Sequence, residues 1–401
     1  MKLLSVEKAC SPDCEGYVRI SALVSKQNGK HLTFWFDIPS ELEGEISDSG
    51  NPWVVCMLLH ALENGEDVEL NLPLDAFLNE NLKGLMMEWI QWFPHLKPVK
   101  ITAPIVSCRP DVEAPWRTGA FFSGGLDSWF TAIRHSPDKC VQAVGQVDDL
   151  INVHGFDIPL SSFGELDAMT KTLRTAAAAM QRTLVVVRTN LRSTGGLWGE
   201  AWGAISHAAG LSAVGLVLEK RFGKILIGSA HSYGNLIPWG SHPMTDPLFS
   251  TSGLAIAHDG AMYTRVEKTK LVSSYDFAIE NLHVCWFGGT ASNCGECPKC
   301  LRTMVALELF GVPPGRMPSR VPFDIERAKK TYLGSWSEES FFVELRDAAS
   351  AVGDSRIRSA MRYAIWKSRL LRPLRKLGER AAKLPGLRRF GGAIFRRLKT
   401  I

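Results

Sequence analysis

One six-residue segment combines side chains and spacing that can hold a phosphate. It reads Ser123-Gly124-Gly125-Leu126-Asp127-Ser128. A short apolar run precedes it and a helix-compatible stretch, residues 129–134, follows it, so the sequence predicts a strand, a glycine turn and a helix. Adjacent glycines let backbone N–H groups approach an anion, the two serine hydroxyls add donors, and the positive end of the helix points to the same place. The segment is therefore a candidate phosphate-binding loop.

Four cysteines form a second group, whose spacing is typical of a metal site. They are Cys285, Cys294, Cys297 and Cys300, in the spacing C-x8-C-x2-C-x2-C. Gly295 and Pro298 predict tight turns that bring successive thiolates together. Four thiolates suit tetrahedral Zn²⁺, and such a closed site is structural because no coordination position is left for water. An iron–sulfur cluster uses the same ligands, so the spacing leaves both metals open.

The composition is that of an ordinary globular protein. The 401 residues are 45% hydrophobic and 22% charged, a length that allows two or three domains. The first residues lack the apolar core of a signal peptide, and no run of eighteen apolar residues occurs. We therefore expect a cytoplasmic protein whose cysteines are reduced, with a peripheral position at the membrane as an alternative.

Three domains are expected along the chain. Residues 1–113 predict an α+β domain, because alternating strands at 17–24 and 31–36 flank an Asn-Gly turn. Residues 114–312 carry the candidate loop and the cysteines, and residues 313–401 predict a helical region with a basic tail. Further elements expected in the first domain are helices at 52–62 and 74–93 and strands at 67–72 and 99–106.

The middle domain alternates short apolar runs with helical stretches. The runs are residues 141–144, 184–187 and 225–227, and the helices are residues 163–180, 201–222 and 271–281. This order predicts an α/β fold with a doubly wound parallel sheet, in which ligands bind at the carboxyl ends of the strands.

The loops expected at those strand ends hold the other candidate site residues. His154, Asp157, His231 and His242 are candidates for substrate binding. Arg188 and Lys268 are candidates for contacts to a pyrophosphate or a carboxylate, because both ligands favour cationic partners.

The glycine segment is not a Walker A loop, because no lysine follows its glycines. Its spacing resembles the PP-loop, S-G-G-x-D-S, of the ATP pyrophosphatase superfamily, whose members cleave ATP between the α and β phosphates and adenylate a carboxylate or a carbonyl-like oxygen. The resemblance implies that residues 123–128 bind ATP. We expect Asp127 and Ser128 to act in catalysis together with the loop candidates Arg188 and Lys268. Mg²⁺, with Asp127 as a ligand, is expected to offset charge on the leaving pyrophosphate.

The loop and the four cysteines together resemble the 7-cyano-7-deazaguanine synthase family over residues 117–312. Members of that family use ATP to activate a carboxylate, accept ammonia to give an amide, and then dehydrate it to a nitrile. The resemblance implies an ATP-dependent C–N bond-forming ligase with ATP, Mg²⁺ and Zn²⁺. The loops at 228–235 and 239–243 match no deazaguanine-site pattern, so another carboxylate, on a small molecule or a protein, stays open.

Two other functions fit the same motifs. One is a PP-loop enzyme of the tRNA thiolation type, which needs a reactive cysteine near the loop; Cys140 is the cysteine of the middle domain outside the group of four. The other is a nucleotide-binding adaptor without catalytic activity, at a membrane or in a complex.

The charge of the chain is concentrated in its last residues. Residues 355–401 contain fifteen Lys and Arg and one acidic residue, Glu379, a charge of +14; with +5 for the whole chain, residues 1–354 carry −9. Leu370, Leu374 and Leu377 begin an apolar stripe at helical spacing, and a second stripe follows after Pro385. Three partners fit this basic tail: the protein itself, an anionic membrane surface, or tRNA.

Overall fold

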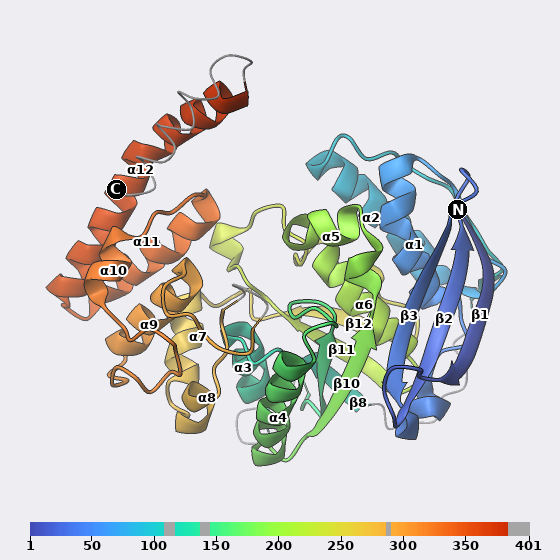
Figure 1. Ribbon diagram of the computed structural model, residues 1–401, viewed down its shortest axis with the longest axis horizontal. Coiled ribbons are helices and arrows are strands. Elements are labelled where there is room, and N and C mark those ends of the chain that lie inside the picture. Colours follow the sequence, from blue (N-terminus) through green and yellow to red (C-terminus); the bar gives the residue numbers. More distant parts are fainter. Residues whose placement is uncertain (108–116, 137–144, 286–289, 384–401) are drawn as a thin grey trace. The chain divides into compact units, whose positions relative to one another are not determined.

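The computed structural model describes residues 1–107, 117–136, 145–285 and 290–383 (Figure 1). The fold is mixed α/β with a large, mostly parallel sheet. Two compact units divide the chain, the first made of Met1–Tyr263 and Tyr275–Ala291 and the second of Thr264–Ser274 and Ser292–Ile401. The expected boundaries at 113 and 312 do not coincide with this division.

The N-terminal segment begins with three antiparallel strands joined in sequence order. The expected strands at 17–24 and 31–36 and the helices at 52–62 and 74–93 are present, and a strand over the first ten residues adds to them. The elements are β1 (Lys2–Cys10), β2 (Tyr17–Ser25), β3 (His31–Pro39), α1 (Asn51–Asn64), β4 (Val68–Glu69), β5 (Leu74–Asp75), α2 (Ala76–Trp92), β6 (Ile101–Thr102) and β7 (Ile105–Val106).

The following segment alternates strands and helices. It comprises β8 (Arg117–Phe121), α3 (Leu126–Arg134), β9 (Asp149–His154), α4 (Phe163–Ala179), β10 (Thr183–Thr189), α5 (Leu197–Glu200), α6 (His207–Val217), β11 (Phe222–Gly228) and β12 (Ala255–Asp259), with α8 (Asp276–Glu280) further on. The expected strand at 141–144 lies outside the described residues. The expected helix at 201–222 is shorter, because a π-helical stretch, Trp202–Ser206, precedes α6.

The two segments share one sheet. Its strand order is β12-β11-β8-β9-β10-β3-β2-β1-β4-β6. The five strands from β12 to β10 are parallel, and β10 pairs antiparallel with β3 through Arg188 opposite Asp37 and Thr189 opposite Phe36. Five strands of the α+β segment therefore extend the sheet of the α/β segment, whereas β5 and β7 pair in a separate two-stranded sheet.

Alternate residues of the parallel strands face different helices. Ile151, Val187 and Ile225 pack in one apolar core with α1 and α6. Their neighbours in each strand point to the other face, where the right-handed connections from β8 to β9 and from β9 to β10 place α3 and α4. The chain then crosses back past β8 to reach β11. The strand order thus reverses between β8 and β11, and ligands of open α/β sheets bind at such a point.

The second unit is helical. It contains α7 (Arg265–Val272), α9 (Pro298–Leu309), α10 (Ile325–Lys330), α11 (Trp336–Ala351) and α12 (Ser355–Lys383). Its core includes Leu301, Phe342 and Ile357. The helix expected at 271–281 is not continuous: α7 begins earlier, at Arg265, because Thr264 and Glu267 form a capping box, and it ends at Val272, while α8 covers Asp276–Glu280. No helix among the described residues has the length and hydropathy to cross a bilayer.

Candidate functional site

The candidate phosphate-binding segment connects β8 to α3, as the sequence predicts. Gly124 has φ +75°, a left-handed conformation that favours glycine, and a Cβ there would lie 3.1 Å from Leu173 Cδ2. Gly125 is the N-cap of α3 and, as a glycine, brings no side chain to the first turn. The N–H groups at the start of α3 therefore meet no competing capping oxygen from the N-cap residue.

Two remote groups and one internal hydrogen bond hold this loop in place. The N–H of His283 donates to Gly124 O at 2.8 Å, and the side-chain amide of Asn152 on β9 donates to Phe122 O at 3.0 Å. Within the loop, Ser128 Oγ donates to Gly125 O at 2.9 Å. Ser128 is thus buried and stiffens the turn, whereas Ser123 is exposed and Asp127 is partly exposed. The sequence did not predict Asn152 or His283, because their contacts lie far away in the chain.

The start of α3 lies against the end of β11. A Cβ on Gly228 would lie 3.0 Å from Asp127 O, a backbone atom that cannot move aside cheaply. The first turn of α3 therefore approaches β11 closely because residue 228 has no side chain. This contact places the loop after β8 beside the loop after β11, at the reversal of strand order.

A buried carboxylate anchors the other end of α3. Asp259, on β12, accepts from Thr131 Oγ1 at 2.8 Å and from Arg134 at 2.9 Å, and it lies 3.1 Å from His135 Nε2. Burial alone would raise the pKa of Asp259, but the contacts with His135, Arg134 and Thr131 bring it below its usual value. Asp259 thus fixes α3 to the sheet, a role that its position in the sequence does not reveal.

His154 and Arg188 lie next to each other on the paired strands β9 and β10, yet both contact protein groups. His154 Nε2 lies 2.9 Å from Thr170 Oγ1 of α4, and burial, with a smaller effect of the Arg188 charge, lowers its pKa to about 4. Arg188 is buried and pairs with Asp37 of β3 at 3.4 Å. These contacts stabilise the sheet and the packing of α4.

The other predicted substrate residues lie on two connections, His231 and His242 between β11 and β12 and Asp157 after β9. His231 follows β11, is buried, and packs edge-on against Trp239 with 5.8 Å between ring centroids. His242 Nδ1 accepts from the N–H of Met244 at 3.1 Å, and its ring packs against Trp92. Burial and then the charge of His258 lower the pKa of His242. Asp157 is exposed on the loop after β9.

Lys268 belongs to α7 in the second unit, where it is fully buried. The structure describes this side chain within that unit.

A hydrogen-bonded pair of Asp246 and His258, which the sequence did not predict, lies close to His242. Asp246 accepts from His258 Nδ1 at 2.7 Å and from Ser241 Oγ at 2.6 Å through one oxygen, and from the His242 N–H at 2.9 Å through the other. This network orders the loop between β11 and β12. Three members lie within residues 241–246 and the fourth, His258, lies on β12, so spacing in the sequence does not connect His258 with the others.

The four cysteine sulfurs gather as the sequence predicts. The Sγ atoms of Cys285, Cys294, Cys297 and Cys300 all lie within 4.8 Å of one another. Cys294 and Cys300 are 3.8 Å apart, close to the edge of about 3.8 Å that a tetrahedron with Zn–S bonds of about 2.3 Å requires. Backbone N–H groups of Glu296 and Cys297 point at Cys294 Sγ at 3.4 and 3.3 Å.

The turn between the cysteines depends on glycine. Gly295 has φ +78°, and a Cβ at this position would lie 2.2 Å from Val321 O. Cys297 then caps α9, because its Sγ accepts from the N–H of Cys300 at 3.4 Å. The donor set, the burial and the sulfur spacing therefore fit a four-coordinate metal ion of the zinc type.

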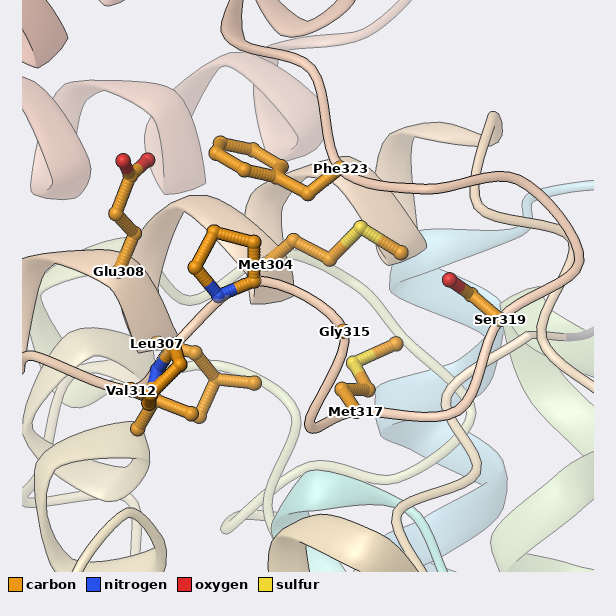
Figure 2. Close-up of a pocket in the computed structure, with 10 residues that line it drawn as sticks. Met304, Leu307, Glu308, Val312, Gly315, Met317, Ser319 and Phe323 are labelled. Atoms are coloured by element: carbon orange, nitrogen blue, oxygen red, sulfur yellow. The ribbon is translucent and has the colours of Figure 1, made fainter.

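A separate apolar pocket lies beside α9 in the second unit (Figure 2), with an empty volume of about 310 Å³. Met304, Met317 and Phe323 contribute to its lining. Glu308 also lines it and accepts a hydrogen bond from Arg356. None of the predicted site residues lines this pocket, and its surface offers little chemistry.

Comparisons with protein-family models, with curated proteins and with solved structures find no significant match to this chain.

Proposed function

We propose that this protein is an ATP-dependent enzyme with a doubly wound PP-loop fold, which activates a carboxylate as an acyl-adenylate for attack by ammonia or an amine. The observation that supports it most is the position of residues 123–128, directly after β8 and at the reversal of strand order. Gly124 in its left-handed conformation and Gly125 at the helix start leave backbone donors for a pyrophosphate there.

The residues of this loop have different roles in the proposed reaction. The first-turn N–H groups of α3 and the exposed Ser123 hydroxyl bind phosphate oxygens, and the partly exposed Asp127 is the ligand for Mg²⁺. Ser128 keeps the turn rigid through its bond to Gly125. Arg188 has no phosphate role in this proposal, because its guanidinium neutralises the buried Asp37. Catalysis is then mainly positioning and charge stabilisation.

The four cysteines hold Zn²⁺ in this proposal. A closed set of four thiolates leaves no position for water, so the metal supplies folding free energy, on the order of 10 kcal/mol, and takes no part in the reaction. The iron–sulfur alternative differs in a simple observable, since such clusters absorb visible light and Zn²⁺ does not.

Product analysis with α-labelled ATP tests the proposed chemistry. Wild-type protein should form AMP and pyrophosphate in the presence of the right carboxylate, with 7-carboxy-7-deazaguanine plus ammonia and a cell extract as the first additives. Asp127→Ala should lower the rate by about a hundredfold or more. Asp167→Ala, an exposed carboxylate on α4, is the matched control and should keep the wild-type rate.

Other outcomes support the other functions. Stimulation by tRNA and a sulfur donor would favour the thiolation enzyme, although its candidate cysteine, Cys140, lies outside the described residues. Bound ATP and metal without any turnover would favour the adaptor. ADP as the product, or equal rates for the two variants, would overturn the adenylation proposal.

A further inference from the structure

Helix α12 carries two apolar faces. One face packs in the core of the second unit through Ile357, Met361 and Ile365. The opposite face is apolar as well, but it is exposed. Its residues, called here the outer stripe, are Tyr363, Trp366, Leu370, Leu374 and Leu377, with exposed fractions of 41%, 58%, 56%, 47% and 61%.

The spacing makes the outer stripe continuous. Its members follow one another at intervals of three, four, four and three residues, so they lie along one line of the helix. Tyr363 and Trp366 contact each other, with 5.7 Å between ring centroids. Five large exposed side chains in one line form the kind of patch that marks a binding surface, whereas single exposed apolar residues are common.

Cations flank the outer stripe. Arg358, Arg362 and Arg369 are exposed, and their spacing of four and seven residues places them on one side of it. Arg369 pairs with Glu339. Residues 355–383 contain ten Lys and Arg and a single acidic residue, and residues 384–401, which lie outside the described part, add five cations and no acid.

The outer stripe together with its flanking arginines favours one of the possible partners over the others. A second copy of the helix on the outer stripe would bring two rows of arginines together, and the like charges would repel. A nucleic acid needs the cations but gains nothing from a line of leucines. An anionic lipid surface uses both, since leucine and tryptophan enter the boundary of the acyl chains while arginine contacts the headgroups. Tryptophan and tyrosine also favour this boundary.

We propose that α12 is a membrane-contact helix, whose outer stripe binds the surface of bilayers that contain anionic lipids. The helix lies in the plane of the interface and does not cross it, which agrees with its charge. This inference is independent of the adenylation proposal, because it rests on the second unit alone.

Vesicle flotation of the full-length protein tests the proposal. The wild type should float with vesicles of phosphatidylcholine containing 30% phosphatidylserine, and much less with pure phosphatidylcholine. Raising the salt concentration from about 50 to about 500 mM should weaken binding, because the headgroup attraction is screened. The readout does not involve ATP, so it can fail or succeed separately from the proposed reaction.

Two variants separate the contributions of the helix. Leu370→Glu with Leu374→Glu should reduce the partition coefficient by about a hundredfold, because two apolar contacts are lost and two negative charges face the lipid. Arg358→Gln with Arg362→Gln should reduce it by about tenfold or more on anionic vesicles only. Met87→Glu, a change of an equally exposed apolar residue on α2, is the matched control and should float like the wild type.

Circular dichroism of each variant should match the wild type, since the changed side chains are exposed. The proposal is overturned if the wild type does not bind anionic vesicles, or if the double leucine variant binds as the wild type does. It is equally overturned if the leucine changes convert a dimer to a monomer, or abolish tRNA binding, while leaving flotation unchanged.

Discussion

Single residues of the candidate loops serve structural purposes that their types do not reveal. His154 is an example, since a histidine at the end of a parallel strand suggests substrate binding, yet its ring contacts Thr170. Its partner is remote in sequence, and so is Asp37, the partner of Arg188. Spacing along the chain therefore predicted the position of these residues at the sheet edge but not their contacts.

The neutral state of His154 gives a prediction for pH. Its folded pKa of about 4 is below the unfolded value of about 6.5, so the folded state resists protonation. Above pH 6.5 the residue has no effect, and as the pH falls from 6.5 towards 4 it lowers the free energy of unfolding, by about 2 kcal/mol at pH 5. His154→Gln should remove this contribution. The free energy of unfolding, measured with urea, should then differ less between pH 7 and pH 5 than it does in the wild type.

A control is available in the same unit. His60 also has its pKa lowered to about 4, by burial and then by the charge of Lys26, so it should continue to cost stability in the His154 variant. An unchanged pH dependence in His154→Gln would show that His154 is protonated in the folded protein.

The cysteine cluster was predictable because its four ligands are close in sequence and because Gly295 allows the turn between them. Cys297→Ser should lower the zinc content of purified protein from about one ion per chain to near zero, with a large loss of thermal stability. Cys10→Ser, an exposed cysteine outside the cluster, should keep the metal. Elemental analysis measures both, and full zinc content in Cys297→Ser would contradict a four-thiolate site.

At the scale of elements, local sequence patterns predicted helices and strands well. Strands that depend on partners far away in the sequence were not predicted. The alternation in β2 and β3 and the glycine turn before α3 are local patterns, and the structure contains all three elements. Strand β9 was missed because it begins with the buried Asp149, whose burial depends on salt bridges to Arg117 and Arg221. Strand β12 was missed because its sequence, Ala255–Asp259, ends in a histidine and an aspartate that are stabilised by remote partners.

The contact between β11 and α3 gives a prediction at this scale. In Gly228→Ala the new Cβ would meet Asp127 O at 3.0 Å, so the first turn of α3 must shift. We expect ATP affinity to fall by about tenfold, because the donors of this turn are then misplaced. Gly234→Ala, in the loop after β11 where a Cβ meets no atom within 4 Å, is the matched control. Calorimetric titration with ATP measures the affinity of both variants. Equal ATP affinities would show that the nucleotide binds elsewhere.

At the scale of the whole molecule, the sequence predicted a separate domain over residues 1–113, and the structure joins this segment to the central sheet. The junction is the antiparallel pairing of β3 with β10. Asp37, fully buried there, accepts from Arg19 at 2.6 and 2.9 Å and from Arg188 at 3.4 Å. One carboxylate therefore neutralises cations from both segments, which sequence patterns cannot reveal because the partners are 151 residues apart.

This junction predicts that the two segments unfold together. Asp37→Asn leaves the buried Arg188 without its charge partner and Arg19 with the exposed Asp13 alone, at a cost of about 3–5 kcal/mol, and amide exchange should accelerate in β2 and in β9 by the same free energy. Asp13→Ala removes a carboxylate that contacts the same Arg19 at 2.7 Å but is 54% exposed, so it should cost at most about 1 kcal/mol. Acceleration confined to β1, β2 and β3 would mean that the shared sheet does not couple them, and that residues 1–113 behave as the independent domain their sequence suggests.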